Sequence, residues 1–518
     1  ESMAGRYLYL FVILTNLIFG INNEITVNFS NSPNKFDYQF LDEDTEEKIS
    51  EFLIEGLTRQ DETGNSIPGI AEAWEVRDDG LVWTFHLRDA KWENGDPVTA
   101  NDFKFAWLRA LENKEPYRQW LLYPIKGARN LNKGKGKKED VGVKVIDSKT
   151  LEVTLETPTE YFDSFLSQPI TTPLNEKFYN IHKEKYGMNV ENIISNGPYK
   201  LIEWSNEGDL ELIKNKNYWA EKSIKIEKIK IKSIHYPSVL SSFEKGELDI
   251  SEIDYDDYTE VKKNKNLNYY EDGSIWYLEY NLKNNFLSNK KIRQALTLAV
   301  DKEELSLVLQ DVGKPAYGYV PSYIKGTNKT FREEAGDTFP HYNPEEARKL
   351  FAEGLKELGM DKAPKVSIIF NDAGNNKKII QYVQEKIRKE LGLELDDQSL
   401  SFKGRLSRMI QKDFDIILAG WSADYSDALS YMELWVTDGG NNHISYSNPK
   451  YDKLIKIGQT SPEQKTRIEA MIQAEKILGE DVPISVIFYK QRMILINPKL
   501  KGIMLKSFGN SYYLNNTY

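Results

Sequence analysis

The stretch DFDIILAGWSADYSDALSYMELW, residues 413–435, starts as a strand and then changes character. Its first six residues have the apolar pattern of a β-strand, whereas the residues that follow are small, aromatic and acidic. The role of these residues at the end of a strand has to be inferred from the fold that the rest of the chain predicts.

Around this stretch, strand and helix patterns are mixed along the whole chain. Period-two alternation predicts strands at 25–29, 82–87, 150–155, 209–214 and 224–234. N-cap residues and apolar spacing at i, i+3 and i+4 predict helices at 44–57, 100–111, 343–358 and 461–478. This mixture, without a fixed-period repeat, indicates an α/β protein of several lobes.

Composition limits the class of protein. At roughly 100–200 residues per domain, 518 residues hold several domains, and the absence of cysteine removes disulfides and thiolate metal sites. The net charge of −11 argues against nucleic acid as a partner. Aromatic residues make up 12% of the chain, and Tyr and Trp suit wet recognition surfaces for sugars, peptides or aromatic ligands.

Motifs of catalysis are missing. Gly420, Trp421 and Ser422 run into Asp424 where a serine hydrolase elbow needs a second glycine, and no phosphate-binding glycine loop is present. We therefore expect no enzyme and no cofactor. The alternative is a carbohydrate-active enzyme that uses some of the 79 carboxylates, which spacing alone cannot pair.

The first twenty residues are excluded from the fold. Arg6 and the apolar run at 7–19 resemble a secretory signal, which predicts export. A lipid anchor would need a cysteine after the signal, but Gly20 is followed by Ile21. We still expect attachment to the membrane surface through a lipid anchor, although the cysteine that would carry the lipid is absent from this sequence.

A family resemblance emerges from the longest motif, WTFHLRDAKWENGDPVTANDFKFAWLRAL at 83–111. It closely resembles the signature of the family 5 extracellular solute-binding proteins, the oligopeptide-, dipeptide- and nickel-binding subunits of ABC importers. Further blocks match in family order: PGIAEAW at 68–74, SNGPYKL at 195–201, NKNYW at 215–219, KIRQALTLAVDK at 291–302, YNPEEARKL at 342–350, DFDIILAGWSADY at 413–425 and YSNPKYDKL at 446–454.

The resemblance implies an α/β fold of the two-lobed Venus flytrap class, with an additional domain inserted in the first lobe. Lobe I would comprise 21–54, 180–280 and 484–518, the additional domain 55–179, and lobe III 281–483. Ligand binds between the lobes, which close by a hinge motion. The family's function would be capture of oligopeptides outside the cytoplasm, at a cell surface or in a periplasm, by a monomer that delivers them to permease subunits.

The same resemblance assigns a role to the opening stretch. Asp424 would bind the ligand's terminal ammonium through a charge-assisted hydrogen bond. The small residues Ala419, Gly420 and Ala423 would let an extended peptide approach and pair with the backbone as an added strand, and Ser422 beside them is expected to contact the ligand too. Opposite them, Asp42 and Asp44 would flank the ligand and favour basic peptides, or simply cap the helix that follows.

Cleft side chains follow from the same alignment. Trp120, Phe402, Trp421 and Asn376 are expected to line the cleft, with Asn371 and Trp276 as further candidates. Arg405 is a candidate partner for the ligand's carboxylate, beside Arg408 and Lys403.

Two further readings of the family remain open. A peptide-signal receptor of pheromone type would have the same fold, and a nickel or dipeptide binder is the less favoured alternative, because His443 is a lone histidine near a family block. We also hypothesise that the apolar segment 7–19 of one molecule occupies the cleft of its neighbour. Ligand length, side-chain preference, the choice between nutrient uptake and signalling, and the native anchor are not encoded in recognisable motifs.

Overall fold

The structure, a computed structural model, describes residues 23–235, 237–506, 511–515, 517 and 518. The signal-like segment 1–20 lies outside the described residues. The hypothesis that residues 7–19 occupy a neighbour's cleft concerns this segment and is therefore not tested. In the described part of the chain, no helix combines the length and the hydropathy needed to cross a membrane.

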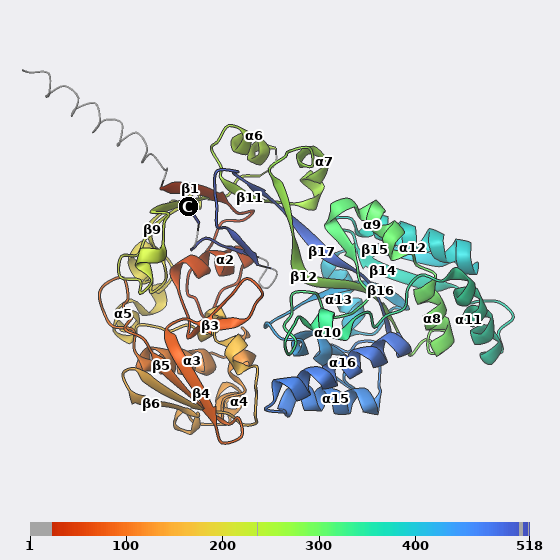
Figure 1. Cartoon of the computed structure of the whole chain (residues 1–518), viewed down its shortest axis with the longest axis horizontal. Helices are drawn as coiled ribbons and strands as arrows, with labels where there is room; N and C mark the ends of the chain where they lie inside the picture. Colours follow the sequence, from red (N-terminus) through yellow and green to blue (C-terminus); the bar gives the residue numbers. More distant parts are fainter. Residues whose placement is uncertain (1–22, 236, 507–510, 516) are drawn as a thin grey trace, which may run out of the picture.

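One mixed eleven-stranded sheet runs through the middle of the molecule (Figure 1). Its strand order is β15-β14-β16-β12-β17-β11-β1-β10-β9-β8, and β13 pairs with β17 beside this path. The strands are β1 (Glu24–Asn28), β8 (Tyr199–Trp204), β9 (Leu210–Lys214), β10 (Lys228–Lys232), β11 (Ile250–Ile253), β12 (Leu267–Tyr280), β13 (Gly313–Pro315), β14 (Val366–Asn371), β15 (Leu395–Leu400), β16 (Ile416–Ser422) and β17 (Ile484–Ile496). The strands predicted at 25–29, 209–214 and 224–234 are confirmed as β1, β9 and the shorter β10.

Two long strands, β12 and β17, connect the two lobes. They pair antiparallel with each other along most of their length. At one end β17 pairs with β11 through Met493–Ile496, and at the other β12 pairs with β16 through Ser274–Tyr280. The sheet of the first lobe is therefore continuous with that of the second through these two strands.

A second, four-stranded antiparallel sheet lies on the side of the first lobe, below β1 in Figure 1. Its strands are β4 (Ala71–Arg77), β5 (Val82–Leu87), β6 (Val143–Asp147) and β7 (Thr150–Thr154). Next to it lies α3 (Ala100–Glu112), where a reciprocal capping box between Thr99 and Asp102 satisfies the first turn. The strands predicted at 82–87 and 150–155 are confirmed as β5 and β7, and the helix predicted at 100–111 is confirmed as α3. The boundaries of the additional domain, 55–179, remain a prediction.

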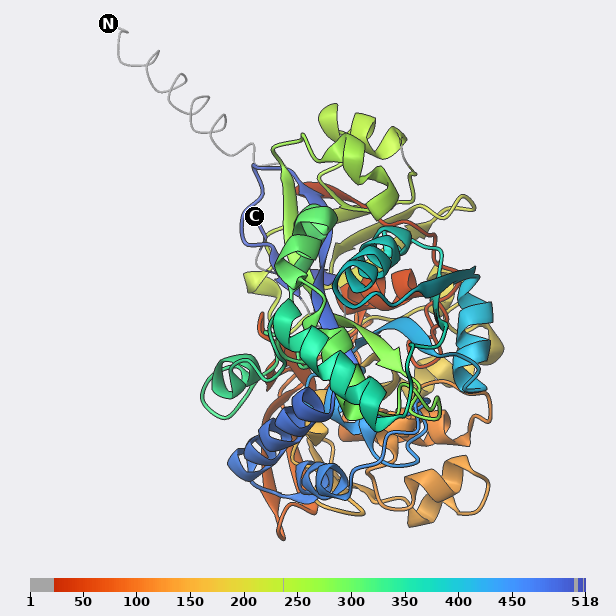
Figure 2. The same cartoon turned by 90° about the vertical axis from the view of Figure 1, so that its right-hand side faces the viewer.

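The second lobe is covered by helices, which Figure 2 shows from their own side. They are α8 (Lys290–Leu298), α9 (Lys302–Leu309), α10 (Phe331–Ala335), α11 (Pro344–Glu357), α12 (Asn376–Leu391), α13 (Phe402–Ile410), α14 (Leu429–Met432), α15 (Pro449–Thr460) and α16 (Gln464–Asp481). The helices predicted at 343–358 and 461–478 are confirmed as α11 and α16. In α11, Pro344 occupies the first turn and Asn343 caps it.

The helix predicted at 44–57 ends earlier than expected. As α2 it covers Asp44–Leu53, with Ile54 in extended conformation. Asn196 pairs with the backbone of Glu55 in both directions, accepting from its N–H at 2.8 Å and donating to its C=O at 3.0 Å. This contact from a distant segment replaces the next helical turn.

Candidate functional site

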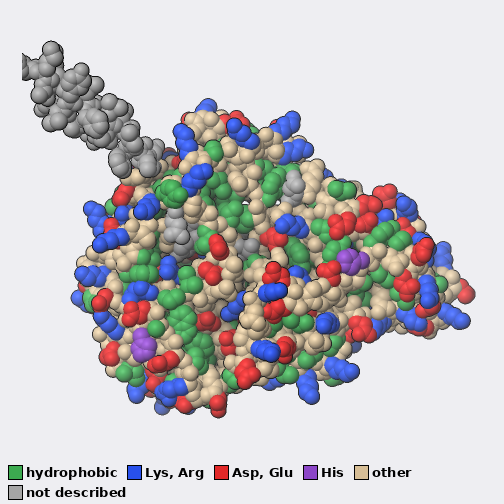
Figure 3. Space-filling view, viewed as in Figure 1, with side chains coloured by type: hydrophobic (Ala, Val, Ile, Leu, Met, Phe, Trp, Pro, Cys, Tyr) green, Lys and Arg blue, Asp and Glu red, His purple; other side chains and the backbone are tan. Residues whose placement is uncertain are grey.

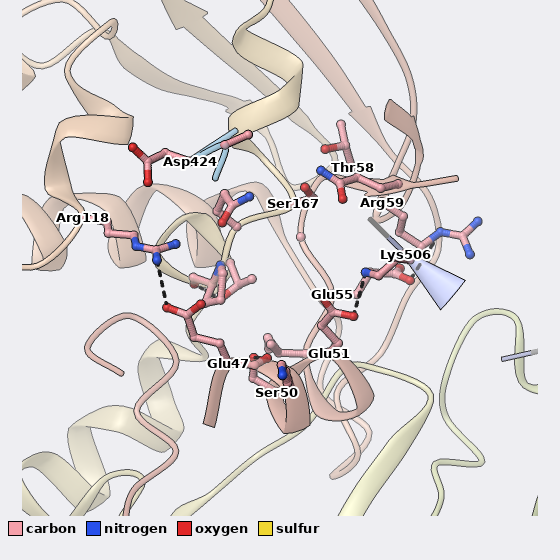
Figure 4. Close-up of a pocket in the computed structure, with 18 of the residues that line it drawn as sticks. Glu47, Ser50, Glu51, Glu55, Thr58, Arg59, Arg118, Ser167, Asp424 and Lys506 are labelled. Carbon is pink, nitrogen blue, oxygen red and sulfur yellow. Dashed lines mark hydrogen bonds and ion pairs between the residues drawn. The ribbon is translucent and has the colours of Figure 1, made fainter. Parts of the chain in front are cut away.

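A cavity of 280 Å³ lies between the lobes at the point where β16 ends (Figure 4). From the second lobe it is lined by Ser422, Ala423 and Asp424, and from the first lobe by the acidic face of α2. Asp272 of β12 and Arg118 complete this part of the wall. The stretch at 413–435 thus delivers a carboxylate to an interlobe space.

The carboxylate of Asp424 is half-buried at the end of the strand. Its backbone N–H donates to Ser430 Oγ at 2.9 Å, which fixes the turn after the strand. Burial raises the pKa of the side chain, and the nearby Arg118 opposes this shift. No hydrogen bond or ion pair links the carboxylate to another residue in the described ranges.

The other acids of the cavity are neutralised in pairs. Four of them lie on or just after α2, and each has a cation nearby: Asp44 with Lys48 at 3.0 Å, Glu47 with Arg118 at 3.6 Å, Glu51 with Lys506 at 2.8 Å, and Glu55 with Arg59 at 3.6 Å. In total six carboxylates face four cations. The surplus negative charge is the reason that a cationic group would be favoured beside Asp424.

A second cavity of 190 Å³ contains Trp276, Asn371 and Asn376 together with Lys490 and Arg492. Arg492 Nε lies 3.2 Å from Asp272 Oδ2, and Asp272 belongs to the first cavity. This ion pair therefore joins the two cavities along the floor formed by β12 and β17.

The backbone of β16 is free on one edge at this place. It pairs with β12 over its whole length, but with β14 only through Ile416 and Ile417. Among the described strands, none pairs with residues 419–422 on that edge. A sheet edge of this kind is a ready template for an extended peptide.

Comparison with known proteins agrees with this architecture. The sequence model described as "Bacterial extracellular solute-binding proteins, family 5 Middle" matches residues 65–443. The chain belongs to this family. The dipeptide-binding protein DppE of Bacillus subtilis is 32% identical over 488 residues, which cover 93% of this chain and 90% of that protein.

Two solved structures resemble this chain over nearly its whole length. Listeria monocytogenes OppA bound to peptide is 32% identical, covers 96% of this chain and 99% of its own, and has a TM-score of 0.72. The unliganded open form of the murein tripeptide binding protein MppA is 26% identical, covers 96% and 98%, and has a higher TM-score of 0.83. The backbone of this chain therefore superposes better on the second structure than on the first, despite the lower identity.

Two aromatic residues expected to line the family 5 cleft, Trp120 and Trp421, make packing contacts next to the first cavity. Trp120 packs against Phe165 and Tyr425, with ring centroids 6.2 Å apart in both cases. Trp421 donates its indole N–H to the C=O of Ser430 at 2.8 Å. Neither lines the two cavities described above, because their rings hold together the segments around Asp424.

Gly420 also has a packing role. A Cβ at this position would lie 2.8 Å from the Trp276 ring, so the glycine makes room for that ring. Ser422 and Ala423 do face the first cavity.

Phe402 and Arg405 also lie outside both cavities. Phe402 is 61% exposed at the start of α13. Arg405 is buried and acts electrostatically on Glu279, whose pKa burial raises to about 8 while Arg405 opposes the shift. Arg405 therefore serves a core carboxylate.

The acidic residues 42–44 were expected either to flank the ligand or to cap the helix, and they do not all do the same. Glu43 caps the helix and forms a reciprocal capping box with Glu46. Asp42 pairs with Lys35 at 2.9 Å and lies outside the cavity lining, whereas Asp44 faces the first cavity.

Charged residues of both cavities were missed in the sequence: Glu47, Lys48, Glu51, Glu55, Arg59, Arg118, Asp254, Asp272, Lys490, Arg492 and Lys506. For α2 a signal existed, since residues 44, 47, 48 and 51 share one helix face by their spacing. For the others, segments far apart in the chain meet only in the fold. Figure 3 shows that acidic and basic side chains are also interspersed over the outer face, so charge alone does not mark the site.

Proposed function

We propose that this protein captures peptides between its two lobes and delivers them to the permease of an ABC importer. The observation that carries the proposal is the half-buried carboxylate of Asp424, without a partner among the described residues, at the tip of a strand with a free edge. The carboxylate faces the interlobe gap, and the free edge of β16 borders it.

Binding would use the parts that all peptides share. The terminal ammonium binds Asp424 through a charge-assisted hydrogen bond, which contributes about 1.5–3 kcal/mol. The amide groups that follow pair with the free edge of β16. Because these contacts do not depend on side chains, they would accept many peptide sequences.

The names of the relatives support this reading: one is a dipeptide-binding protein, one is bound to peptide, and one binds a murein tripeptide. We further propose that the protein is exported, works as a monomer and is held at the outer membrane face by a lipid anchor. Closure of the lobes from the open arrangement would bury the ligand before it reaches the permease.

The experiment that tests the proposal is calorimetric titration with free-amine and N-acetylated versions of the same peptides. Free-amine peptides should bind the wild-type protein about 10- to 100-fold more tightly than acetylated ones. Asp424→Asn should remove most of this difference, whereas Asp361→Asn, at an exposed loop position, should preserve it. Equal affinity of both peptide forms for the wild-type protein would reject the proposal.

The breadth of binding separates nutrient uptake from signalling. A panel of unrelated peptides should bind with similar affinities if the protein feeds an importer. One tight ligand among non-binders would instead identify a peptide-signal receptor.

A further inference from the structure

A third cavity, of 480 Å³, lies outside the interlobe gap. Two of the blocks that carry the family resemblance meet at this cavity. Its lining comes from the segment after β5 in the block 83–111, from Lys216 and Asn217 in the block 215–219, and from Lys149 between β6 and β7. Neither block contributes a residue to the two cavities of the gap. Peptide binding in the gap therefore does not account for this cavity.

The walls of the third cavity are held together by hydrogen bonds between distant segments. Asn217 Nδ2 donates to the C=O of Glu93 at 3.0 Å. The N–H of Glu93 donates to the C=O of Ser195 at 2.8 Å, and the N–H of Ser195 donates to the Glu93 carboxylate at 2.9 Å. The loop that carries Lys216 is thus fixed against the loop that carries Lys91.

The lining of this cavity is strongly basic. It contains one carboxylate, Asp89, and four cations, which are Arg88, Lys91, Lys149 and Lys216. Asp89 pairs with Lys149, which leaves three positive charges in a chain whose net charge is −11. Cations gathered around a concave surface raise the local concentration of anions.

The guanidinium of Arg88 is held in place at this cavity. Its Nε donates to the C=O of Gly69 at 2.6 Å, and its central carbon lies 3.6 Å from the centroid of the Trp219 ring. The two terminal nitrogens of Arg88 make no hydrogen bond with any residue that the structure describes. These N–H groups are therefore available to an acceptor in the cavity.

The two exposed lysines carry most of the uncompensated charge. Arg88 is attracted by Glu55 and Glu72, although Glu55 also lies 3.6 Å from Arg59. Lys91 and Lys216 are exposed, and neither forms an ion pair within the described part of the chain. An anion that enters the cavity thus meets one fixed arginine and two mobile ammonium groups.

We propose that this cavity binds a phosphate group. Arginine presents planar N–H donors that match the oxygens of a phosphate, and lysines add point charges. A phosphate monoester has up to two negative charges and three acceptor oxygens, so it neutralises the three cations better than a single carboxylate does. The proposal is separate from peptide capture and does not rest on it.

A phosphate group can reach the cavity as a free anion or within the head group of an anionic lipid. The chemistry at the three cations is the same for both sources. The experiment therefore has one arm for each.

The first arm is calorimetric titration of the full chain with inorganic phosphate at constant ionic strength, with acetate as a singly charged comparison. Phosphate should bind the wild-type protein about tenfold more tightly than acetate, or better. Because a ligand of the folded state stabilises it, Tm should also rise with the phosphate concentration.

The variant for both arms is Lys91→Met combined with Lys216→Met, which should weaken phosphate binding about tenfold or more and leave peptide affinity unchanged. The control is Lys137→Met combined with Lys144→Met. It removes the same charge from two exposed lysines outside the cavity and should preserve phosphate binding. Thermal unfolding without phosphate checks that both double variants fold.

The second arm is sedimentation with vesicles of phosphatidylglycerol, compared with vesicles of phosphatidylcholine. If the head group reaches the cavity, the wild-type protein and the control should sediment with the anionic vesicles and the Lys91 and Lys216 variant should not. Binding of inorganic phosphate without sedimentation would identify a free anion as the ligand.

The outcomes are distinct. Loss of binding in the Lys91 and Lys216 variant alone, in either arm, supports the proposal. Equal loss in the control would assign binding to the overall charge and overturn the proposal. A wild-type protein that binds neither probe, or a cavity variant that binds as the wild type does, would overturn it as well.

Discussion

Replacement of Arg467 by Met tests how the fold holds the turn that carries Asp424. Arg467 is completely buried in α16. Its guanidinium donates to Asp427 at 2.8 and 3.1 Å, to Glu160 at 3.1 Å and to the C=O of Gly458 at 2.7 Å. Asp427 follows Asp424 by three residues and accepts the backbone N–H of Leu429 at 2.9 Å.

The magnitude follows from the burial of both charges. Asp427 is also completely buried, so removal of Arg467 takes away the cation that forms hydrogen bonds with its carboxylate. Breaking a buried pair in this way costs about 3–5 kcal/mol. At roughly 2–4 °C per kcal/mol for domains of this size, Tm should fall by about 6–20 °C.

The assay is urea denaturation followed by tryptophan fluorescence, with Arg408→Met as control. Arg408 is a partly exposed arginine that also donates to a backbone C=O, and its loss should cost less than about 1 kcal/mol. The double variant Arg467→Met with Asp427→Asn should recover part of the loss, because the stranded charge is gone. A loss below 1 kcal/mol for Arg467→Met would refute the reasoning.

Three further predictions follow from the same structure. The affinity for free-amine peptides should be constant near neutral pH and fall as the pH drops toward the pKa of Asp424, which burial raises above its ordinary value; titrations at a series of pH values would show no such fall in Asp424→Asn. Gly420→Val should displace the Trp276 ring and cost about 1–3 kcal/mol, seen as a lower urea midpoint and a changed tryptophan spectrum; an unchanged spectrum would contradict the contact. Asn196→Ala should cost about 2–4 kcal/mol, because it leaves the buried N–H and C=O of Glu55 without their partner; thermal unfolding indistinguishable from the wild type would exclude that role.

Much of the fold could be predicted from local patterns. The α/β class, α3, α11, α16 and several strands follow from capping residues and apolar spacing, which act over a few residues. The end of α2 could not, because Asn196 reaches Glu55 across 141 positions. An interaction of this range leaves no trace in the periodicity around residue 54.

The site was predictable to a similar extent. Asp424, Ser422, Ala423 and Asp44 face the first cavity, and Trp276, Asn371 and Asn376 face the second. Trp120 and Trp421 lie outside both cavities, since an aromatic residue near a cleft motif serves packing as readily as recognition. Lys490 and Arg492 were missed, since a cation on a strand signals nothing until the strand is seen to line a cavity.

The most direct test of the account is a crystal structure of the protein with a bound peptide that has a free amino end. The account predicts closed lobes with the ligand's ammonium nitrogen about 2.7–2.9 Å from a carboxylate oxygen of Asp424 and its first amides paired with residues 420–422. A ligand bound with its amino end away from Asp424, or outside the interlobe gap, would contradict it.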